Sequence, residues 1–224
     1  MTQKIRFICI SDTHNRLGDV TLPPGDLLIH AGDLTGRGSL EEIEQVAKQL
    51  AALDYKHKIV IAGNHDFAFE RDPENARRIF KKYAPDVIYL QDEAVTLYGL
   101  KIYGSPWQPW FHSWAFNLQR GAPIKEKWDL IPNDTDILIT HGPAYGFCDQ
   151  TSRGDLAGCE ELAQAITEHI RPQYHVFGHI HEGYGQKTDP VSGTVHINAS
   201  ICTLRYAPTN QPIIFDAMPA IAQR

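Results

Sequence analysis

Carboxylate and imidazole side chains follow the apolar segments of this chain, and the first pair is Asp12-x-His14. It comes directly after the apolar run Ile5–Ile10. In an extended segment, side chains two positions apart point the same way, so a strand would deliver both groups to one place. A carboxylate and an imidazole together suit a divalent transition metal ion. Taken alone, the pair is equally well explained as an Asp-initiated turn followed by a surface histidine.

Four further apolar segments end in side chains of the same chemical kinds. They are Asp33 after residues 27–30, Asn64 and His65 after 58–62, His141 after 137–140, and His179 and His181 after 174–177. Each of these residues alone has an ordinary structural explanation. Their recurrence after successive strands makes coincidence a poor explanation, because α/β proteins form their sites at the carboxyl ends of strands.

The combined donor set favours hydrolysis of a phosphoester by metal ions. It contains carboxylates, imidazoles and one amide but no thiolate, which suits Mn, with Fe or Zn as alternatives. Seven candidate ligands are too many for one divalent ion and enough for two that share a carboxylate. Two ions about 3.5–4 Å apart can clamp a phosphoryl group and lower the pKa of a water molecule. The predicted reaction is attack of a metal-bound hydroxide on phosphorus.

Residue spacing predicts the elements that would position these side chains. Ser39 and Glu42 have the spacing of a helix-capping box, and Pro73 suits the first position of a helix. The expected elements are helices at 39–53, 72–83 and 160–170, strands at the five apolar segments, a hairpin turning at Gly99 between 95–97 and 101–103, and strands at 194–198 and 212–215. This alternation of strands and helices indicates an α/β fold.

An aromatic-rich segment separates the hairpin from the strand at 137–140. It includes Trp107, Trp110 and Phe111 within residues 105–118, and we expect no regular structure until about Asp136. Irregular segments of this length are usually functional or disordered, and the aromatic content argues against disorder. Two interpretations stay open. The loop is pinned by aromatics in a satellite core, or it is a wall or lid of the substrate pocket on which a base could stack.

The overall composition is that of an ordinary globular protein. The chain has 224 residues, is 42% hydrophobic and 21% charged, and has a net charge of −6. We expect one domain over residues 1–224, because no linker or low-complexity tract divides the chain. The acidic balance and the lack of a basic cluster argue against long nucleic acids as partners. A small anionic substrate is compatible, since bound metal ions supply local positive charge.

The sequence also predicts the cellular setting. No apolar run is long enough to span a bilayer and no signal peptide is recognisable, so we expect a cytoplasmic protein without a membrane partner. Its four cysteines form no C-x-x-C pair, and we expect free thiols in a reducing compartment. The oligomeric state is left open.

Taken in order, the motifs resemble those of the calcineurin-like metallophosphoesterases. The motifs are Asp12-x-His14, Gly32-Asp33, Gly63-Asn64-His65-Asp66, His141-Gly142 and Gly178-His179-x-His181. The resemblance runs from residue 5 to about residue 200. It implies an α/β fold, specifically a four-layer αββα sandwich of two mixed β-sheets flanked by helices, with the site at the strand C-termini.

The resemblance also implies a role for each motif residue. One metal ion would be held by Asp12, His14, Asp33 and His181, and the other by Asp33, Asn64, His141 and His179. His65 would stabilise charge on the phosphoryl group or protonate the leaving oxygen, with Asp66 orienting it. Asn64, His65 and His141 would also contact the substrate.

A narrower resemblance is to the brain-239 type of metallophosphoesterase-domain proteins, which are similar to class III cyclic nucleotide phosphodiesterases. It rests on segments such as residues 104–109, 114–117 and 197–200. Some animal members have Gly where this chain has His179, so the resemblance implies a full catalytic site here. The leading prediction is a dinuclear-metal phosphodiesterase that hydrolyses small phosphodiesters such as cyclic nucleotides. The alternatives are a metal-dependent phosphomonoesterase or protein phosphatase, and a weakly active nucleotide-binding regulator.

Overall fold

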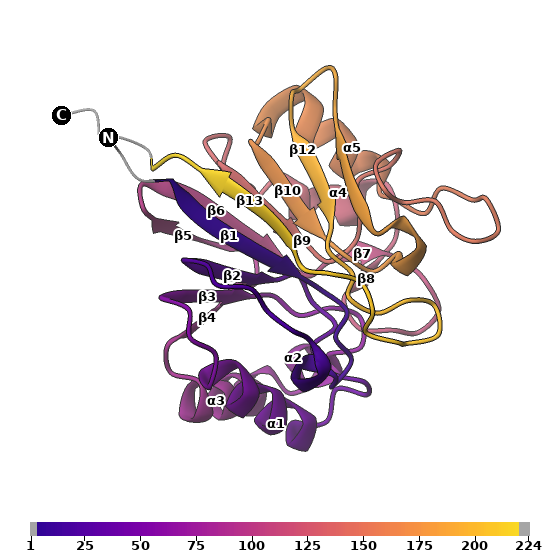
Figure 1. The fold of residues 1–224 in the computed structure, drawn as a ribbon. Coiled ribbons are helices and arrows are strands. Elements are labelled where there is room, and N and C mark those ends of the chain that lie inside the picture. Colours follow the sequence, from indigo (N-terminus) through magenta and orange to yellow (C-terminus); the bar gives the residue numbers. More distant parts are fainter. Residues whose placement is uncertain (1–3, 220–224) are drawn as a thin grey trace.

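Two mixed β-sheets form the centre of the computed structural model, which describes residues 4–219 (Figure 1). The first sheet has the order β13-β1-β2-β3-β4. Its strands are β1 (Ile5–Ile10), β2 (Leu27–His30), β3 (His57–Val60), β4 (Val87–Tyr89) and β13 (Ile213–Ala217). Strands β1 to β4 are parallel and β13 is antiparallel to β1. The carboxyl ends of β1, β2 and β3 therefore lie at the same edge of this sheet.

The second sheet has the order β11-β12-β10-β9-β6-β5. Its strands are β5 (Glu93–Leu97), β6 (Leu100–Ser105), β9 (Ile137–Thr140), β10 (Tyr174–Phe177), β11 (Gly185–Thr188) and β12 (Val195–Asn198). The four strands β6, β9, β10 and β12 are parallel, and the two edge strands are antiparallel to their neighbours. The hairpin predicted around Gly99 is the pair β5–β6.

The two sheets pack face to face over a shared apolar core. Alternate residues of each strand face the other sheet, as the two-residue period of a strand requires. The core includes Phe7, Leu27, Ile29 and Ile59 from the first sheet, and Ile102, Ile139, Val176 and Ile197 from the second. All of these side chains are almost fully buried.

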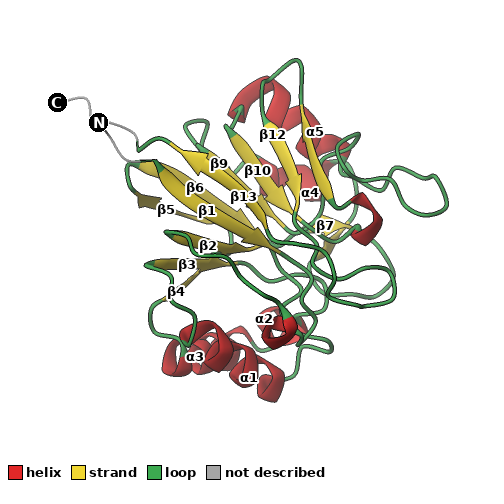
Figure 2. Ribbon diagram, in the orientation of Figure 1, coloured by secondary structure: helices red, strands yellow, loops and turns green. Residues whose placement is uncertain are grey.

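Helices cover the outer face of each sheet, which confirms the four-layer αββα arrangement (Figure 2). The first sheet packs against α1 (Leu40–Ala51), α2 (Phe67–Arg71) and α3 (Pro73–Tyr83), and the second against α4 (Ala122–Trp128) and α5 (Glu160–Ala165). The predicted capping box is present, because the Ser39 side chain accepts from the backbone N–H of Glu42, and the Glu42 carboxylate accepts from that of Ser39. Helix α5 continues into a π-helical turn, η2 (Ile166–Ile170).

The structure differs from the sequence prediction mainly in its short elements. The expectation of no regular structure up to Asp136 is wrong, because this segment contains β7 (Gln108–Pro109), β8 (Asn117–Leu118) and helix α4. In α4, only Ile124 and Trp128 are buried, one turn apart, and so few residues give no periodic signal. Helix α2 and strand β11 were not predicted, and β3 ends at Val60 instead of continuing to residue 62.

A short joint connects the two sheets at the end where the site lies. Ser11, just past β1, forms an isolated parallel bridge with Ser200, just past β12. Its backbone N–H donates to the Ala199 carbonyl at 2.8 Å, and its carbonyl accepts from Ile201 at 2.9 Å. This joint brings the carboxyl ends of strands from both sheets to one place.

Two further predictions concern thiols and membranes. All four cysteines are free, as expected, and only Cys148 is partly exposed. Within residues 4–219, no helix has the length and apolar character needed to cross a membrane.

Candidate metal centre

Side chains from both sheets converge where the strands end. Asp12 and His14 follow β1, Asp33 follows β2, Asn64 and His65 lie beyond β3, His141 follows β9, and His179 and His181 lie beyond β10. Three groups of carboxylate and imidazole atoms lie within 4.8 Å of one another: Asp12, His14 and His181; His14, Asp33 and His65; and Asp12, Asp33 and His141. Most of these residues are buried, and His65, His179 and His181 are partly exposed.

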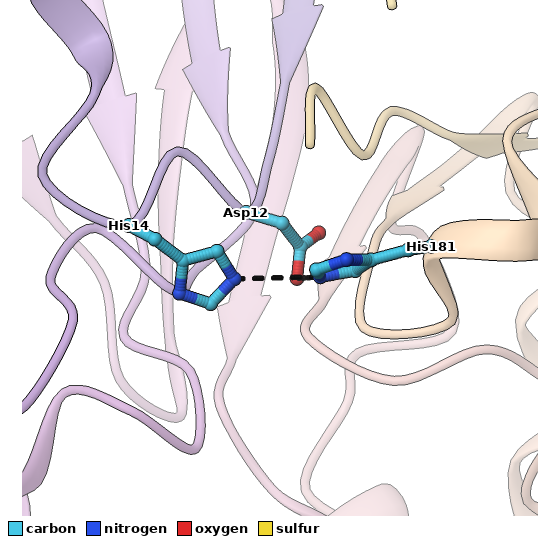
Figure 3. A group of neighbouring side chains, drawn as sticks. All are labelled: Asp12, His14 and His181. Carbon is cyan, nitrogen blue, oxygen red and sulfur yellow. Dashed lines mark hydrogen bonds and ion pairs between the residues drawn. The ribbon is translucent and has the colours of Figure 1, made fainter. Parts of the chain in front are cut away.

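The first group joins the two sheets through Asp12, His14 and His181 (Figure 3). The Nε2 atoms of His14 and His181 lie 3.3 Å apart. His181 Nε2 also lies 3.4 Å from Asp12 Oδ1. Two imidazole nitrogens thus face each other beside one carboxylate, which is a suitable set of donors for one metal ion.

Asp33 lies between two sets of donors. Its Oδ2 atom is 3.8 Å from His14 Nε2, and its Oδ1 atom is 3.5 Å from His141 Nε2. His141 Nε2 in turn lies 2.9 Å from Asn64 Oδ1. The two oxygens of Asp33 therefore point toward different groups, an arrangement that suits a carboxylate shared between two ions.

His179 lies at the edge of the cluster. Its ring packs edge-on against His141 with the centroids 5.0 Å apart, but no close group found among residues 4–219 includes it. Its backbone N–H donates to both oxygens of Asp12, at 3.1 and 3.0 Å. His179 thus contacts the centre through its main chain as well as its ring.

Backbone carbonyls fix the tautomers of the imidazoles. The Nδ1–H groups donate from His14 to Thr35 O at 3.3 Å, from His65 to Gly36 O at 2.8 Å, from His141 to Ala31 O at 3.0 Å and from His181 to Thr203 O at 3.0 Å. A carbonyl oxygen only accepts, so Nδ1 carries the proton and Nε2 faces the cluster. This is how proteins commonly orient histidines that bind metal.

The buried carboxylates set the charges of the centre. Burial opposes ionisation of Asp12 and Asp33, but the surrounding imidazoles outweigh it and hold both pKa values well below the usual range. Burial likewise opposes charge on His141 and His181, but the carboxylates outweigh it and raise the pKa of each to about 9. A metal ion must displace these protons, so metal binding releases protons at neutral pH.

The donor set and the backbone around it fit divalent metal ions. Glycines allow the close approach, since a Cβ atom on Gly178 would lie 2.0 Å from Asp12 Oδ2 and one on Gly63 would lie 2.4 Å from Asp33 Oδ1. Asp12 and Asp33 have φ angles of 54° and 53°, in the left-handed region that non-glycine residues seldom adopt. Such strain concentrates at functional sites.

Asp66 is buried and bonds to the backbone of two turns beside the metal centre. Its carboxylate accepts hydrogen bonds from the backbone N–H groups of Gly63, Leu34 and Thr35, and from the Thr35 hydroxyl. None of the hydrogen bonds described over residues 4–219 joins Asp66 to the His65 ring, which donates to Gly36 instead. An effect of Asp66 on the orientation of His65 would therefore act through the backbone of these turns, and this role stays a prediction. Asp66 ties the turn after β2 to the turn after β3, and burial together with Asp33 raises its pKa to about 6.

One part of the aromatic segment is packed and another part lines a cavity, while a role for that cavity in substrate binding stays a prediction. Trp107 is packed, with its Nε1–H donating to Asp92 at 2.8 Å and its ring 5.5 Å from Phe116. Trp110 and Phe111 are exposed and line a cavity of about 460 Å³ that His179 also borders. Trp107 is partly buried and does not line this cavity, and Lys127 Nζ lies 4.3 Å from its ring centroid, so the structure favours Trp110 and Phe111 over Trp107 for stacking of a base.

Two aromatic neighbours of the site escaped the sequence prediction. Trp114 lies 4.2 Å from the His65 ring, and Tyr206 lies 4.8 Å from the His14 ring and 5.5 Å from the His181 ring. Both come from loops, so they have no strand-end pattern that could mark them. The segments quoted for the narrower resemblance include Trp114, which was the one available signal.

Comparisons with known proteins agree with this geometry. A family model described as calcineurin-like phosphoesterase matches residues 5–183. Human metallophosphoesterase domain-containing protein 1 is 45% identical over 94% of this chain and 70% of its own length. A UPF0046 protein of Caenorhabditis elegans is 40% identical over 95% of this chain and 81% of its own length.

Solved structures show the same fold at low sequence identity. A crystal structure from Thermus thermophilus has a TM-score of 0.63 at 13% identity, over 96% of this chain and 99% of that one. A structure described as a novel archaeal phosphodiesterase has a TM-score of 0.50 at 18% identity, with the same coverage of both chains. Because the family model takes in every strand that ends at the metal centre, the chain belongs to the calcineurin-like metallophosphoesterases, the metal-dependent hydrolases of phosphoesters.

Proposed function

We propose that the protein is a dinuclear-metal phosphodiesterase that hydrolyses small phosphodiesters such as cyclic nucleotides. The observation that carries this proposal is the position of Asp33, whose two oxygens face different donor groups. One ion is held by Asp12, His14, Asp33 and His181, and the other by Asp33, Asn64, His141 and His179. Mn is the ion we expect, with Fe and Zn as alternatives, because the donors are oxygen and nitrogen atoms without thiolate.

The residues of the site have different roles in the proposed reaction. When bound, the ions supply a water of lowered pKa and polarise the phosphoryl group. Asp12 and Asp33, both ionised and buried, hold the positive charge in place. His65 points its Nε2 atom into the site, 4.0 Å from Asp33 Oδ2, because its Nδ1–H is fixed on Gly36. From there, the doubly protonated form of His65 can pass its Nε2 proton to the leaving oxygen.

Three observations favour a small diester as the substrate. The net charge of −6 and the absence of a basic cluster disfavour a long polyanion. The cavity beside His179 gives space for an organic group next to the site. A likeness to a protein described as an archaeal phosphodiesterase points in the same direction.

Reloading metal-stripped protein tests the proposal. The protein would receive Mn, Fe, Zn or Mg in turn and be assayed against p-nitrophenyl phosphate, bis(p-nitrophenyl) phosphate, and 2′,3′- and 3′,5′-cyclic nucleotides. We expect activity to return best with Mn and to be highest on diesters. Activity on the monoester alone would contradict the diesterase assignment, and no activity with any ion would contradict a catalytic role.

A further inference from the structure

The two sides of the metal centre differ in what surrounds them. On the side of Asp33 Oδ2 lie His14 and His65, and Trp114 covers the His65 ring at 4.2 Å. On the side of Asp33 Oδ1 lies His141, with His179 packed against it. The 460 Å³ cavity opens on this second side, where His179 forms part of its lining.

The wall of the cavity that contains Phe111 is held in place. Asn117 Nδ2 donates to the carbonyls of Phe111 and His112, both at 3.1 Å, which fixes the turn that presents Trp110 and Phe111. The Phe111 ring lies edge-on to the His179 ring with the centroids 6.5 Å apart. An aromatic surface is thereby positioned next to a proposed metal ligand.

Other residues of the cavity lining are also held by hydrogen bonds. The Arg120 guanidinium donates to the Gly158 carbonyl at 2.8 Å and the Ala157 carbonyl at 3.1 Å. The Glu182 carboxylate accepts from the backbone N–H of Ser152 at 2.7 Å. These bonds shape a space between two fixed loops, and its aromatic and polar lining is typical of sites for small organic groups.

We propose that this cavity binds the ester group that stays attached to phosphorus during hydrolysis of a diester, and that it prefers a planar aromatic group. The inference rests on the proposed function. In the reaction, the oxygen of water forms a bond to phosphorus, and the bond from phosphorus to the leaving oxygen breaks. The leaving oxygen takes its proton on the His65 side, and the bond to the retained group remains intact. An acyclic diester gives one alcohol and one phosphate monoester, whose organic group remains in the cavity, whereas a cyclic diester opens to a single monoester.

Binding of non-hydrolysable phosphonates tests the cavity without turnover. Phenylphosphonate and methylphosphonate carry the same anionic head group, so the ratio of their dissociation constants measures the contribution of the phenyl ring. A change of this ratio in a variant shows that the ring binds near the substituted residue. Isothermal titration of the Mn-loaded protein should show phenylphosphonate binding roughly tenfold more tightly, because the ring buries apolar surface. In Phe111→Ala we expect the ratio to fall to about threefold or less, as part of that surface is lost.

Two further variants serve as controls. Leu204→Ala removes an apolar side chain that is 54% exposed, close to the 56% of Phe111, and Leu204 is not part of the cavity lining. Trp114→Leu removes the aromatic ring on the His65 side. We expect both variants to keep the wild-type ratio. The proposal would be overturned if the wild type bound both phosphonates equally tightly. It would also be overturned if Leu204→Ala reduced the preference for phenylphosphonate as much as Phe111→Ala does. If Trp114→Leu reduced the preference for phenylphosphonate and Phe111→Ala did not, the phenyl ring would bind on the leaving-group side. That result would also overturn the proposal.

Kinetics separate this proposal from the proposed function. Methyl p-nitrophenyl phosphate and phenyl p-nitrophenyl phosphate share a leaving group and differ only in the retained group. We expect kcat/KM to favour the phenyl ester in the wild type, with the preference reduced in Phe111→Ala. If neither diester is hydrolysed while the phosphonate ratio behaves as expected, the diesterase function fails and the cavity assignment stands. If both are hydrolysed at equal rates in all variants, the cavity assignment fails and the function stands.

Discussion

Two groups of imidazoles in the molecule contain members whose pKa values are shifted in opposite directions. In the metal centre, the pKa values of His141 and His181 are raised to about 9. On the outer face of the second sheet, His175 and His196 form a pair joined by a 3.0 Å bond between their Nδ1 atoms, which we call the outer histidine pair. There, burial lowers the pKa of His196 to about 4 and holds that of His175 well below its usual value.

His141 and His181 lie within 3.5 Å of a buried carboxylate, whereas the influence of Asp189 on His196 does not outweigh burial. The imidazoles of the metal centre face Asp12 and Asp33, which stabilise a positive charge. Those of the outer histidine pair bond to each other and to the Thr140 hydroxyl, and Phe147 stacks on His196 at 3.9 Å. Burial lowers the pKa of His14 and His179 in the metal centre as well, so the carboxylates outweigh burial only at His141 and His181.

The largest effect should follow from removing the shared carboxylate. We expect Asp33→Ala to fold, to lose most of its bound metal and to lose nearly all activity, because each lost ligand commonly costs tenfold or more and Asp33 serves both ions. Metal content by mass spectrometry and circular dichroism would check this. The exposed Asp54→Ala is the matched control. Retention of two ions per chain in Asp33→Ala would rule out the bridging role.

Removing the His65 side chain should lower the rate of hydrolysis without weakening metal binding. We expect His65→Ala to keep its metal ions and to lose about 10²–10⁴-fold in rate, the usual contribution of an acid catalyst. The loss should be smaller for an aryl diester with a good leaving group, which needs little protonation. Comparing good and poor leaving groups checks this, and equal losses for both would argue against proton transfer and leave charge stabilisation as the role.

Replacing His179 tests whether it is a metal ligand, because its side chain lies at the edge of the cluster. We expect His179→Gly to keep one ion tightly bound and to bind the other at least about tenfold more weakly. Excess Mn should restore part of the lost activity. Metal titrations of wild type and variant, followed by activity and by calorimetry, decide the point. Superimposable titration curves would show that His179 is not a ligand.

The outer histidine pair should give the smallest effect, visible only in stability. A histidine whose folded pKa is lowered contributes stability above its unfolded pKa of about 6.5, and this stability is lost as pH falls toward the folded value. The pKa of His196 is about 4, so the window is pH 6.5 to 4. We expect His196→Gln, which keeps a donor for His175, to reduce the pH slope of the unfolding free energy in this window by up to about 1.4 kcal/mol per pH unit.

Urea unfolding of the metal-free protein across this window measures that slope. The histidines and carboxylates of the metal centre are the same in both proteins, so their contributions cancel in the difference. Parallel curves for wild type and variant would show that His196 does not titrate differently in the folded and unfolded states.

The sequence predicts the strands well because their signals are local. The strands at 5–10, 27–30, 137–140 and 174–177 occur at the expected residues, since each is a buried run of apolar side chains. The converging side chains were predictable for the same reason, because they follow those runs directly. Their assignment to particular ions stays a prediction.

What the sequence did not predict depends on contacts between distant loops. Asp66 bonds to the turn after β2, about thirty residues away, and Tyr206 reaches the His14 ring from the far end of the chain. Neither contact leaves a periodic pattern, because loops follow no repeat. The outer histidine pair was not predictable either. His175 and His196 lie on different strands, β10 and β12, and only the pairing of these strands brings them side by side.

The joint between Ser11 and Ser200 has a consequence for the lifetime of the protein. It brings the two sheets together at the metal centre, and the Ser200 hydroxyl donates to Asp12 at 2.8 Å. An ion bound there by residues from both sheets can bind only when both are folded. Binding that is selective for the folded state adds about 2.7 kcal/mol of stability at a free ion concentration one hundred times the dissociation constant. Metal supply would then set how long each molecule survives proteolysis as well as how fast it turns over substrate.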